Sequence, residues 1–211
     1  MPISVNPDLY RPIVRIVDDE ETVRNSEAFT LRVAGLESVC YASAEEFLQK
    51  DNLKHPGCII LDVRMTGMSG PDLQKEINRR EIDLPIIFLS AHGNIGLAVD
   101  TLKRGAKDFF EKPLAPEILR ETVTRLVEEN LASRRERFQI QRKREQYESL
   151  TNRERVILKL VAQNLSNKAI ADQLGIQEHT VKIHRGSACR KLNIRTVLDV
   201  HHFLEAIGEI S

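Results

Sequence analysis

The chain has 211 residues, of which 41% are hydrophobic and 29% charged, and it carries no net charge at pH 7. This composition is typical of a globular protein with room for one medium domain and one small one. The longest apolar runs, such as residues 58–61 and 86–89, are much too short to cross a bilayer, and no signal peptide is recognised. We therefore expect a cytoplasmic protein.

The zero net charge is the sum of an acidic first half and a basic second half. Residues 1–133 contain 16 Lys and Arg against 22 Asp and Glu, whereas residues 134–211 contain 15 against 9. A basic second half suggests a polyanionic partner such as nucleic acid, although the charges could equally solvate two surfaces. Three cysteines, Cys40, Cys58 and Cys189, lack metal-ligand spacing. Because Cys40 and Cys58 lie in apolar runs, we expect them to be buried, in a reducing compartment.

Up to about residue 113, short apolar runs alternate with amphipathic segments. The predicted strands are Ile13–Val17, Ser38–Tyr41, Cys58–Leu61, Ile86–Leu89 and Asp108–Phe110, and the predicted helices are Glu21–Ala34, Ala44–Asp51, Pro71–Arg80 and Ile95–Arg104. This alternation predicts a parallel sheet covered by helices on both faces, with residues 59–61 and 86–89 in central strands. Ser43 and Glu46 predict a capping box at the start of the second helix.

A long helix is predicted from about Pro116 into the 140s. Residues 134–148 are dominated by Arg, Lys, Glu and Gln, which predicts a helical linker or a partner surface. From Thr151 the pattern is purely helical, and Thr151 with Glu154 predicts a second capping box. A short helix over 166–174 ended by Gly175, a third over about 177–192 and a fourth over about 196–207 follow. Two short helices joined by a turn containing glycine predict a helix-turn-helix.

Polar side chains follow four of the five predicted strands. Asp18 and Asp19 end the first, Asp62 the third and Ser90 the fourth, and Lys112 follows the fifth. In an open parallel sheet these strand ends meet at one edge, so we expect one pocket. Carboxylates suit Mg²⁺, and an ammonium and a hydroxyl suit a phosphoryl group, which a carboxylate can accept as an aspartyl phosphate. Each residue alone has a simpler explanation, as a cap, a turn or a solvated charge, but their joint placement predicts a site.

Over roughly residues 10–130 the chain resembles the receiver domain of response regulators. The matching segments are residues 16–19, 61–65, 68–70, 89–91 and 108–113. The resemblance implies that a sensor histidine kinase phosphorylates Asp62. It also implies that Mg²⁺ is held by Asp18, Asp19, Asp62 and the backbone carbonyl of Arg64, and that the phosphoryl group is contacted by Ser90 and Lys112.

The same resemblance assigns further roles around the phosphoryl group. Phe109 matches the aromatic residue that turns inward when the hydroxyl residue moves, although it could equally be simple core. Arg64 and His92 occupy positions that set the lifetime of the acyl phosphate, and His92 could equally be an exposed loop residue. A cis bond is expected between Lys112 and Pro113.

Residues 149–208 resemble the LuxR-type helix-turn-helix, through segments 150–156, 165–176 and 180–192. With the receiver, this resemblance indicates the FixJ/NarL class of response regulators and its FixJ-like branch. The second helix of the unit is expected in the DNA major groove, with flanking groups on phosphates. The predicted DNA contacts are Lys168, Thr180, Lys182, Ile183, His184, Arg185, Gly186 and Arg190.

Three positions of this helix carry expectations of their own. Val181 is predicted to be core, and Lys191 to be a solvated charge at the helix end. Gly186 costs the helix about 1 kcal/mol relative to Ala and offers no side chain to a base. Either the backbone approaches DNA closely at Gly186, or specificity depends on its neighbours.

The predicted fold class is therefore α/β: a flavodoxin-like (βα)5 receiver at 10–130, a helical linker at 131–148 and a small all-α helix-turn-helix domain at 149–208. The predicted function is transcription regulation rather than metabolism. Phosphorylation would dimerise the receiver through residues about 95–110, and the dimer would bind an inverted repeat in promoter DNA. RNA polymerase is the expected partner at the promoter, and we expect transcription to be activated rather than repressed. Two alternatives are a phosphorylation-independent DNA-binding protein and a flavodoxin-like or phosphatase enzyme, although the chain lacks a Gly-rich phosphate loop.

Overall fold

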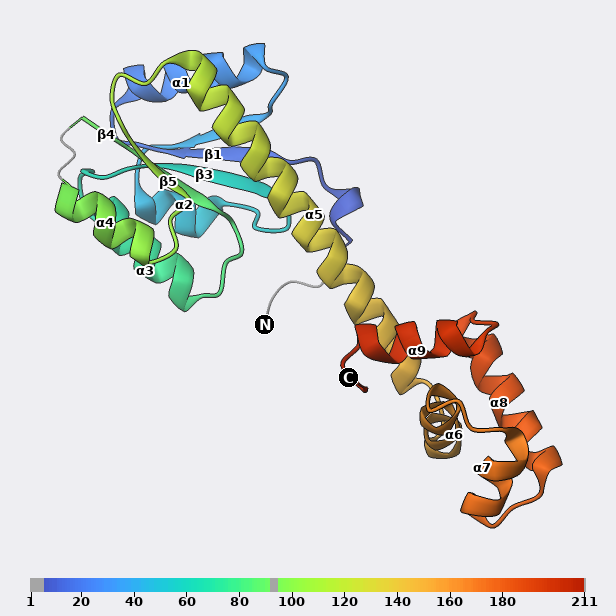
Figure 1. Ribbon diagram of the computed structural model, residues 1–211. Helices are drawn as coiled ribbons and strands as arrows, with labels where there is room; N and C mark the ends of the chain where they lie inside the picture. The colour runs from blue at the N-terminus through green and yellow to red at the C-terminus, as the bar shows by residue number, and fades with distance from the viewer. Residues whose placement is uncertain (1–5, 92–94, 211) are drawn as a thin grey trace. The chain divides into compact units, whose positions relative to one another are not determined.

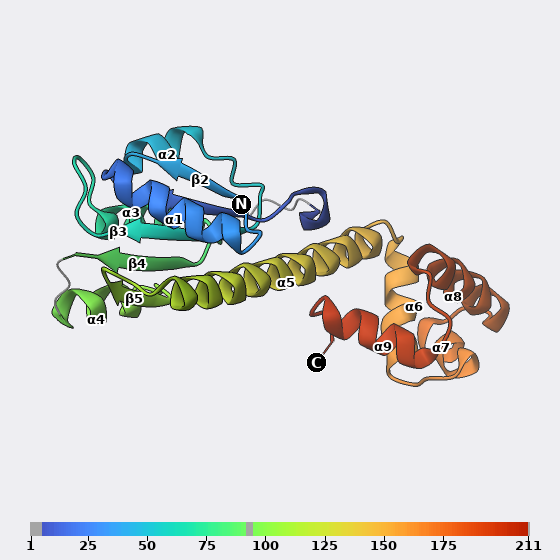
Figure 2. The same cartoon turned by 90° about the horizontal axis from the view of Figure 1, so that it is seen from above.

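The computed structural model describes residues 6–91 and 95–210. The chain divides into two compact units, Met1–Glu136 and Arg137–Ser211. The first unit contains one parallel sheet in the order β2-β1-β3-β4-β5 (Figure 2). Its strands are β1 (Ile13–Val17), β2 (Ser38–Tyr41), β3 (Gly57–Asp62), β4 (Ile86–Ser90) and β5 (Asp108–Glu111). The prediction that residues 59–61 and 86–89 lie inside the sheet is confirmed, because β3 is central and β4 has a neighbour on each side.

Helices cover both faces of this sheet (Figure 1). They are α1 (Glu21–Val33), α2 (Ala44–Lys50), α3 (Gly70–Arg79), α4 (Ile95–Lys103) and α5 (Pro116–Glu148), after a short 3-10 turn at Pro7–Leu9. Successive residues of β1 point to opposite faces. Ile16 packs in the core formed with α1 and α5, whereas Val17 packs in the core formed with α2 and α3. The predicted doubly covered parallel sheet is thus confirmed, with each helix boundary within one residue of its predicted position up to α4.

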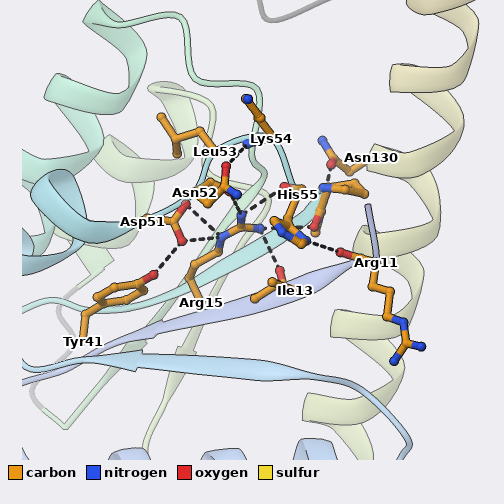
Figure 3. Close-up of polar contacts among 12 residues, drawn as sticks. Arg11, Ile13, Arg15, Tyr41, Asp51, Asn52, Leu53, Lys54, His55 and Asn130 are labelled. Carbon is orange, nitrogen blue, oxygen red and sulfur yellow. Dashed lines mark hydrogen bonds and ion pairs between the residues drawn. The ribbon is translucent and has the colours of Figure 1, made fainter. Parts of the chain in front are cut away.

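One residue of β1 departs from this apolar pattern. Arg15 carries a charged side chain, yet it is fully buried, and Figure 3 shows its polar contacts. All five guanidinium N–H groups have an acceptor. Nε donates to the Asp51 carboxylate at 3.1 Å, and the two Nη atoms donate to the backbone oxygens of Ile13, Asn52, His55 and Pro56 at 2.8–3.2 Å. This buried arginine ties β1 to the segment that leads into β3.

Two sequence expectations in this unit are wrong or only half right. Cys58 is buried as predicted, but Cys40 is exposed, because β2 is an edge strand whose Val39 and Cys40 face solvent. Ser43 caps α2 by accepting a hydrogen bond from the Glu46 backbone at 3.1 Å. The Glu46 carboxylate, however, accepts from the Ala42 backbone N–H rather than from that of Ser43, so the capping box is not reciprocal.

The second unit is entirely helical. It contains α6 (Asn152–Ala162), α7 (Asn167–Leu174), α8 (Glu178–Leu192) and α9 (Val197–Ala206). The predicted capping box of Thr151 and Glu154 is present at the start of α6. Gly175 ends α7 in the left-handed conformation, at φ +63°, and joins it to α8 as the predicted helix-turn-helix. Across the described residues, no helix is both long enough and apolar enough to span a membrane.

The stretch predicted as a polar linker, residues 134–148, has packed residues at each end. Arg134 donates to the Asp83 carboxylate and to the backbone oxygens of Leu53 and Lys54 in the first unit. Tyr147 is buried in the core of the second unit. Because charged residues dominate this stretch, its composition does not indicate that Arg134 and Tyr147 form these contacts.

Candidate functional site

The carboxyl ends of the strands bring three predicted residues into contact. Lys112 Nζ donates to Asp18 Oδ2 at 2.5 Å and to Asp62 Oδ1 at 2.8 Å. Both carboxylates are largely buried, and each also accepts a backbone hydrogen bond: Asp18 from Glu20 and Asp62 from Arg64, both at 2.7 Å. One ammonium is therefore shared by two acids from two different strands.

Burial and pairing oppose each other in this cluster. Burial raises the pKa of Asp62, although the Lys112 ammonium acts to lower it. Desolvation disfavours the charged form of Lys112, but its ion pairs with Asp18 and Asp62 outweigh that cost and raise the pKa of Lys112. The lysine is therefore charged at neutral pH, and it places a positive charge beside the Asp62 carboxylate.

Asp19 lies at the rim of this cluster. Its carboxylate accepts hydrogen bonds from the Thr66 backbone at 2.8 Å and the Thr66 hydroxyl at 2.9 Å, and the first of these lowers the pKa of Asp19 most. Among the described residues, no three His, Cys, Asp or Glu side chains are grouped closely enough to hold a metal ion. The chemistry of the donors nevertheless fits Mg²⁺, since Asp18 and Asp62 offer hard carboxylate oxygens whose two charges one ammonium does not balance.

The remaining predicted site residues differ in burial. Ser90 is buried at the end of β4, and its backbone oxygen accepts from the Lys112 N–H at 2.9 Å. Phe109 is half-buried and stacks on Phe88, with ring centroids 6.0 Å apart. The Arg64 side chain is exposed, and His92 lies outside the described residues. The predicted cis bond between Lys112 and Pro113 is present.

Gly70, at the start of α3, lies against the backbone of the central acid. A Cβ atom at this position would stand 2.0 Å from the Asp62 backbone oxygen and 3.1 Å from the Phe88 ring. No side chain fits such a contact, so the approach of α3 to β3 depends on glycine here.

Several residues near the site were not anticipated from sequence. Thr66 binds Asp19, and Arg24 donates to the Asp18 backbone oxygen at 2.6 Å. Glu27 of α1 is buried close to Lys112, and burial raises the pKa of Glu27 to about 7. The only sequence signal for Glu27 is its spacing, because it lies four residues from Val23 and four from Leu31 on the inward stripe of α1.

In the second unit, α8 presents a mixed polar and apolar face to solvent. Its exposed residues include Lys182, Ile183, Gly186 and Arg190, which helical spacing places on one side. The Ile183 side chain is 56% exposed, and Lys182 forms an exposed ion pair with Glu178 at 2.9 Å. The opposite side of α8 is apolar, and Val181 is fully buried there, which confirms its predicted core position.

Two basic residues of α8 have partners on other helices of the unit. Arg185 Nη1 donates to Asn167 Oδ1 of α7 at 3.0 Å. Lys191 Nζ donates to Glu154 Oε2 of α6 at 2.8 Å. Lys191 is exposed at the helix end as predicted, but it also forms an ion pair with the buried Glu154 that the sequence did not predict. Of the other predicted DNA contacts, Lys168 is exposed at the start of α7, and Thr180 and His184 are half-buried.

Comparison with known proteins agrees with both halves of this description. Residues 14–124 match the model of the response regulator receiver domain, and residues 148–204 match that of the bacterial regulatory proteins of the luxR family. The chain therefore belongs to the response regulators that carry a LuxR-type DNA-binding domain, and it regulates transcription.

Within that class the relatives are FixJ-like. The chain is 37% identical over 198 residues to nodulation protein W of Bradyrhizobium diazoefficiens, covering 94% of this chain and 87% of the relative. It is 35% identical over 184 residues to the transcriptional regulatory protein FixJ of Rhizobium meliloti, covering 87% of this chain and 90% of the relative. The solved structure of the response regulator StyR matches with a TM-score of 0.87 at 37% identity, over 92% of this chain and 98% of that one.

Proposed function

We propose that Asp62 is the phosphoryl acceptor, that a sensor histidine kinase supplies the phosphoryl group, and that Mg²⁺ is required. The observation that carries this proposal is the position of Lys112, whose ammonium lies 2.8 Å from Asp62 Oδ1 at the carboxyl edge of the sheet. An ammonium so placed offsets the charge that a phosphoryl group brings to that carboxylate. Mg²⁺, when bound, would supply further charge neutralisation for phosphoryl transfer.

The residues around Asp62 have distinct proposed roles. Asp18, Asp19, Asp62 and the Arg64 carbonyl would hold Mg²⁺. Ser90 and Lys112 would bind the phosphoryl oxygens, and Phe109 would follow the movement of Ser90. Arg64 and His92 would set the rate at which the protein hydrolyses its own aspartyl phosphate, and thus the lifetime of that phosphate.

The proposed output of phosphorylation is a receiver dimer. The exposed residues Ile95, Val99 and Leu102 lie at helical spacing on α4, with side chains 42–85% exposed. An apolar stripe on the outer face of a surface helix supports its use as a contact between two copies. A two-fold dimer would then present two copies of α8 to an inverted repeat in promoter DNA and recruit RNA polymerase.

The proposed DNA contacts fall into two groups. Lys182, Ile183 and Gly186 would face base edges, with Ile183 against a thymine methyl. Lys168, Thr180, His184 and Arg185 would bind phosphates, and Arg190 would add positive charge on the same helix. The proposed domain limits are residues 10–130, 131–148 and 149–208, and the contacts of Arg134 and Tyr147 support attachment at each end of the linker.

The test of this proposal is Asp62→Asn in the full chain, treated with acetyl phosphate and Mg²⁺. The wild type is expected to gain the mass of one phosphoryl group, to dimerise and to bind promoter DNA more tightly, whereas the variant should do none of these. Asp72→Asn, which alters an exposed acid at the start of α3, is the matched control and should respond as the wild type does. The proposal fails if Asp62→Asn gains the same mass and the same DNA affinity as the wild type.

Gly186→Ala tests separately how Gly186 affects the stability of α8 and how it affects DNA binding. No heavy atom lies within 4 Å of the Cβ that alanine would add, so the substitution should raise the unfolding free energy of the second unit by about 1 kcal/mol. If the backbone approaches DNA here, promoter affinity should fall about tenfold despite the gain in stability. Denaturation and DNA titration measure the two effects, with the exposed Glu205→Ala on α9 as control. Unchanged affinity in Gly186→Ala would assign specificity to the neighbouring residues instead.

A further inference from the structure

A buried acid on α1 has no evident role in the fold. Glu27 is 8% exposed, on the side of α1 that packs with Ala28 and Leu31 against the sheet. Its Oε2 atom is one of two buried side-chain polar atoms in the described residues that have no hydrogen-bond partner. An unpartnered buried carboxyl is unfavourable in either protonation state, so an apolar residue would suit the packing better.

Glu27 shares a cavity with the lysine of the phosphoryl site. The cavity has a volume of about 480 Å³ and is bounded by α1, the end of β4 and the loop from β5 into α5. Glu27 and Lys112 both line it, and the rest of the wall is mainly apolar, with Val23, Leu89 and Leu114 among its residues. Glu27 and Lys112 therefore line one cavity, whose other polar residues, Glu20, Thr22, Ser26 and Thr30, all come from the segment of α1 and the residue before it.

The charges that act on Glu27 come from several elements. Lys112, after β5, favours the ionised form of Glu27, whereas Asp18, directly after β1, and Asp62, at the end of β3, oppose it. Glu20 adds an acidic group to the cavity wall from the start of α1, and Pro116 and Leu119 of α5 add no charge. Burial outweighs these effects and raises the pKa of Glu27 to about 7, so the carboxyl is near the midpoint of its titration at neutral pH.

Lys112 needs another partner whenever a divalent cation binds. Its ammonium occupies the oxygens of Asp18 and Asp62, the same carboxylates proposed to hold Mg²⁺. Two cations that compete for the same oxygens repel each other strongly in a partly buried site. The other nearby acids, Asp19 and Glu20, are exposed to solvent and already accept hydrogen bonds from Thr66 and Thr22, whereas Glu27 is buried with an unpartnered oxygen.

We propose that Glu27 is a positioning residue for Lys112: in the unphosphorylated protein its carboxylate receives the ammonium when a divalent cation takes the place of that ammonium between Asp18 and Asp62, and the ammonium returns to the phosphoryl oxygens once Asp62 is phosphorylated. This inference rests on the proposed function, because it assumes cation binding at those two acids. To accept the ammonium, a protonated Glu27 must release its proton to solvent. Cation binding and proton release are then coupled through a side chain that touches neither the cation nor the phosphoryl group.

The test is calorimetric titration of the full chain with Mg²⁺ at pH 6.5 and pH 8.5, in pairs of buffers with different ionisation enthalpies. At pH 6.5 the wild type should release more than half a proton more per Mg²⁺ than Glu27→Gln does, and at pH 8.5 this difference should vanish. At pH 8.5 Glu27→Gln should also bind Mg²⁺ about tenfold more weakly, because Lys112 then continues to compete for the carboxylates. Glu21→Gln, an exposed acid on the same helix, should match the wild type in both measurements.

Two further variants separate positioning from folding. Glu27→Leu removes the orphaned carboxyl in favour of an apolar side chain, so it should fold at least as well and lose the same proton release and affinity. In a Lys112→Met background, Glu27→Gln should change Mg²⁺ affinity less than twofold, since no ammonium remains to be moved. Equal proton release and affinity in wild type and Glu27→Gln would overturn the inference while the cation site stands. Absence of Mg²⁺ binding by the wild type would overturn the cation site and the inference with it.

Discussion

Replacement of Arg15 by methionine is expected to lower the unfolding free energy of the first unit by about 4 kcal/mol. The substitution keeps an unbranched apolar stem but removes all five donors. The buried Asp51 carboxylate loses its ion pair, and the backbone oxygens of Ile13, Asn52, His55 and Pro56 lose a donor each. The Asp51 carboxylate keeps the Tyr41 hydroxyl as a donor but no positive charge beside it, and removing one partner of a buried ion pair is among the most costly changes in a protein interior.

Hydrogen exchange followed by mass spectrometry measures this effect unit by unit, which suits a chain of two units. Protection of peptides from β1 and β3 should fall about 1,000-fold. Arg11→Met is the matched control, because Arg11 forms an exposed pair with Glu37 and should change stability by less than about 0.5 kcal/mol. Adding Asp51→Asn to Arg15→Met should recover part of the loss by removing the uncompensated charge. A loss below about 1 kcal/mol for Arg15→Met would show that the cluster contributes little.

Glu154→Gln is expected to lower the unfolding free energy of the second unit by about 3 kcal/mol. The buried Glu154 carboxylate accepts from the Thr151 backbone at 2.8 Å, the Ser187 hydroxyl at 2.7 Å and Lys191 Nζ at 2.8 Å. Burial alone would raise the pKa of Glu154, but the bonds from Lys191, Ser187 and Thr151 hold it at about 2. The acid thus joins α6 to the DNA-binding helix α8.

The sign of the pH dependence follows from that lowered pKa. The contribution of ionised Glu154 to the unfolding free energy is fully present above the pKa of this group in the unfolded chain, about 4.5. It is lost as the pH falls toward the folded-state pKa of about 2. Hydrogen exchange of peptides from α6 and α8 should show a large difference between wild type and Glu154→Gln at pH 6 and a smaller one near pH 3. Glu178→Gln, which removes an exposed pair with Lys182, should leave protection nearly unchanged. A pH-independent difference would mean that the ionised form of Glu154 is not what stabilises this unit.

Elements set by local patterns could be predicted from the sequence. The strands follow from apolar runs and two of the helix starts from Ser43 and Thr151, both of which cap as expected. The contact of Asp18, Asp62 and Lys112 was also accessible, because a parallel sheet forces the carboxyl ends of its strands together.

What the sequence could not supply are partners that come from distant or irregular segments. Arg15 interrupts a buried strand, which is a visible signal, but its acceptors lie in a segment with no repeating pattern. Lys191 looks like a solvated charge until α6 brings Glu154 beneath it. Cys40 looks buried because its neighbours are apolar, but only the strand order shows that β2 is an edge.

The contact between Gly70 and the Asp62 backbone limits how this protein can change. Because a single added carbon would stand 2.0 Å from that backbone oxygen, even alanine must displace either α3 or the strand end that carries the acid. At Gly186 the same carbon would meet nothing within 4 Å. In a library of random single variants screened for folded protein alone, position 70 should accept only glycine while position 186 accepts many residues. The choice of residue at position 70 would then be restricted by packing within the protein. Any restriction at position 186 would have to come from a binding partner such as DNA.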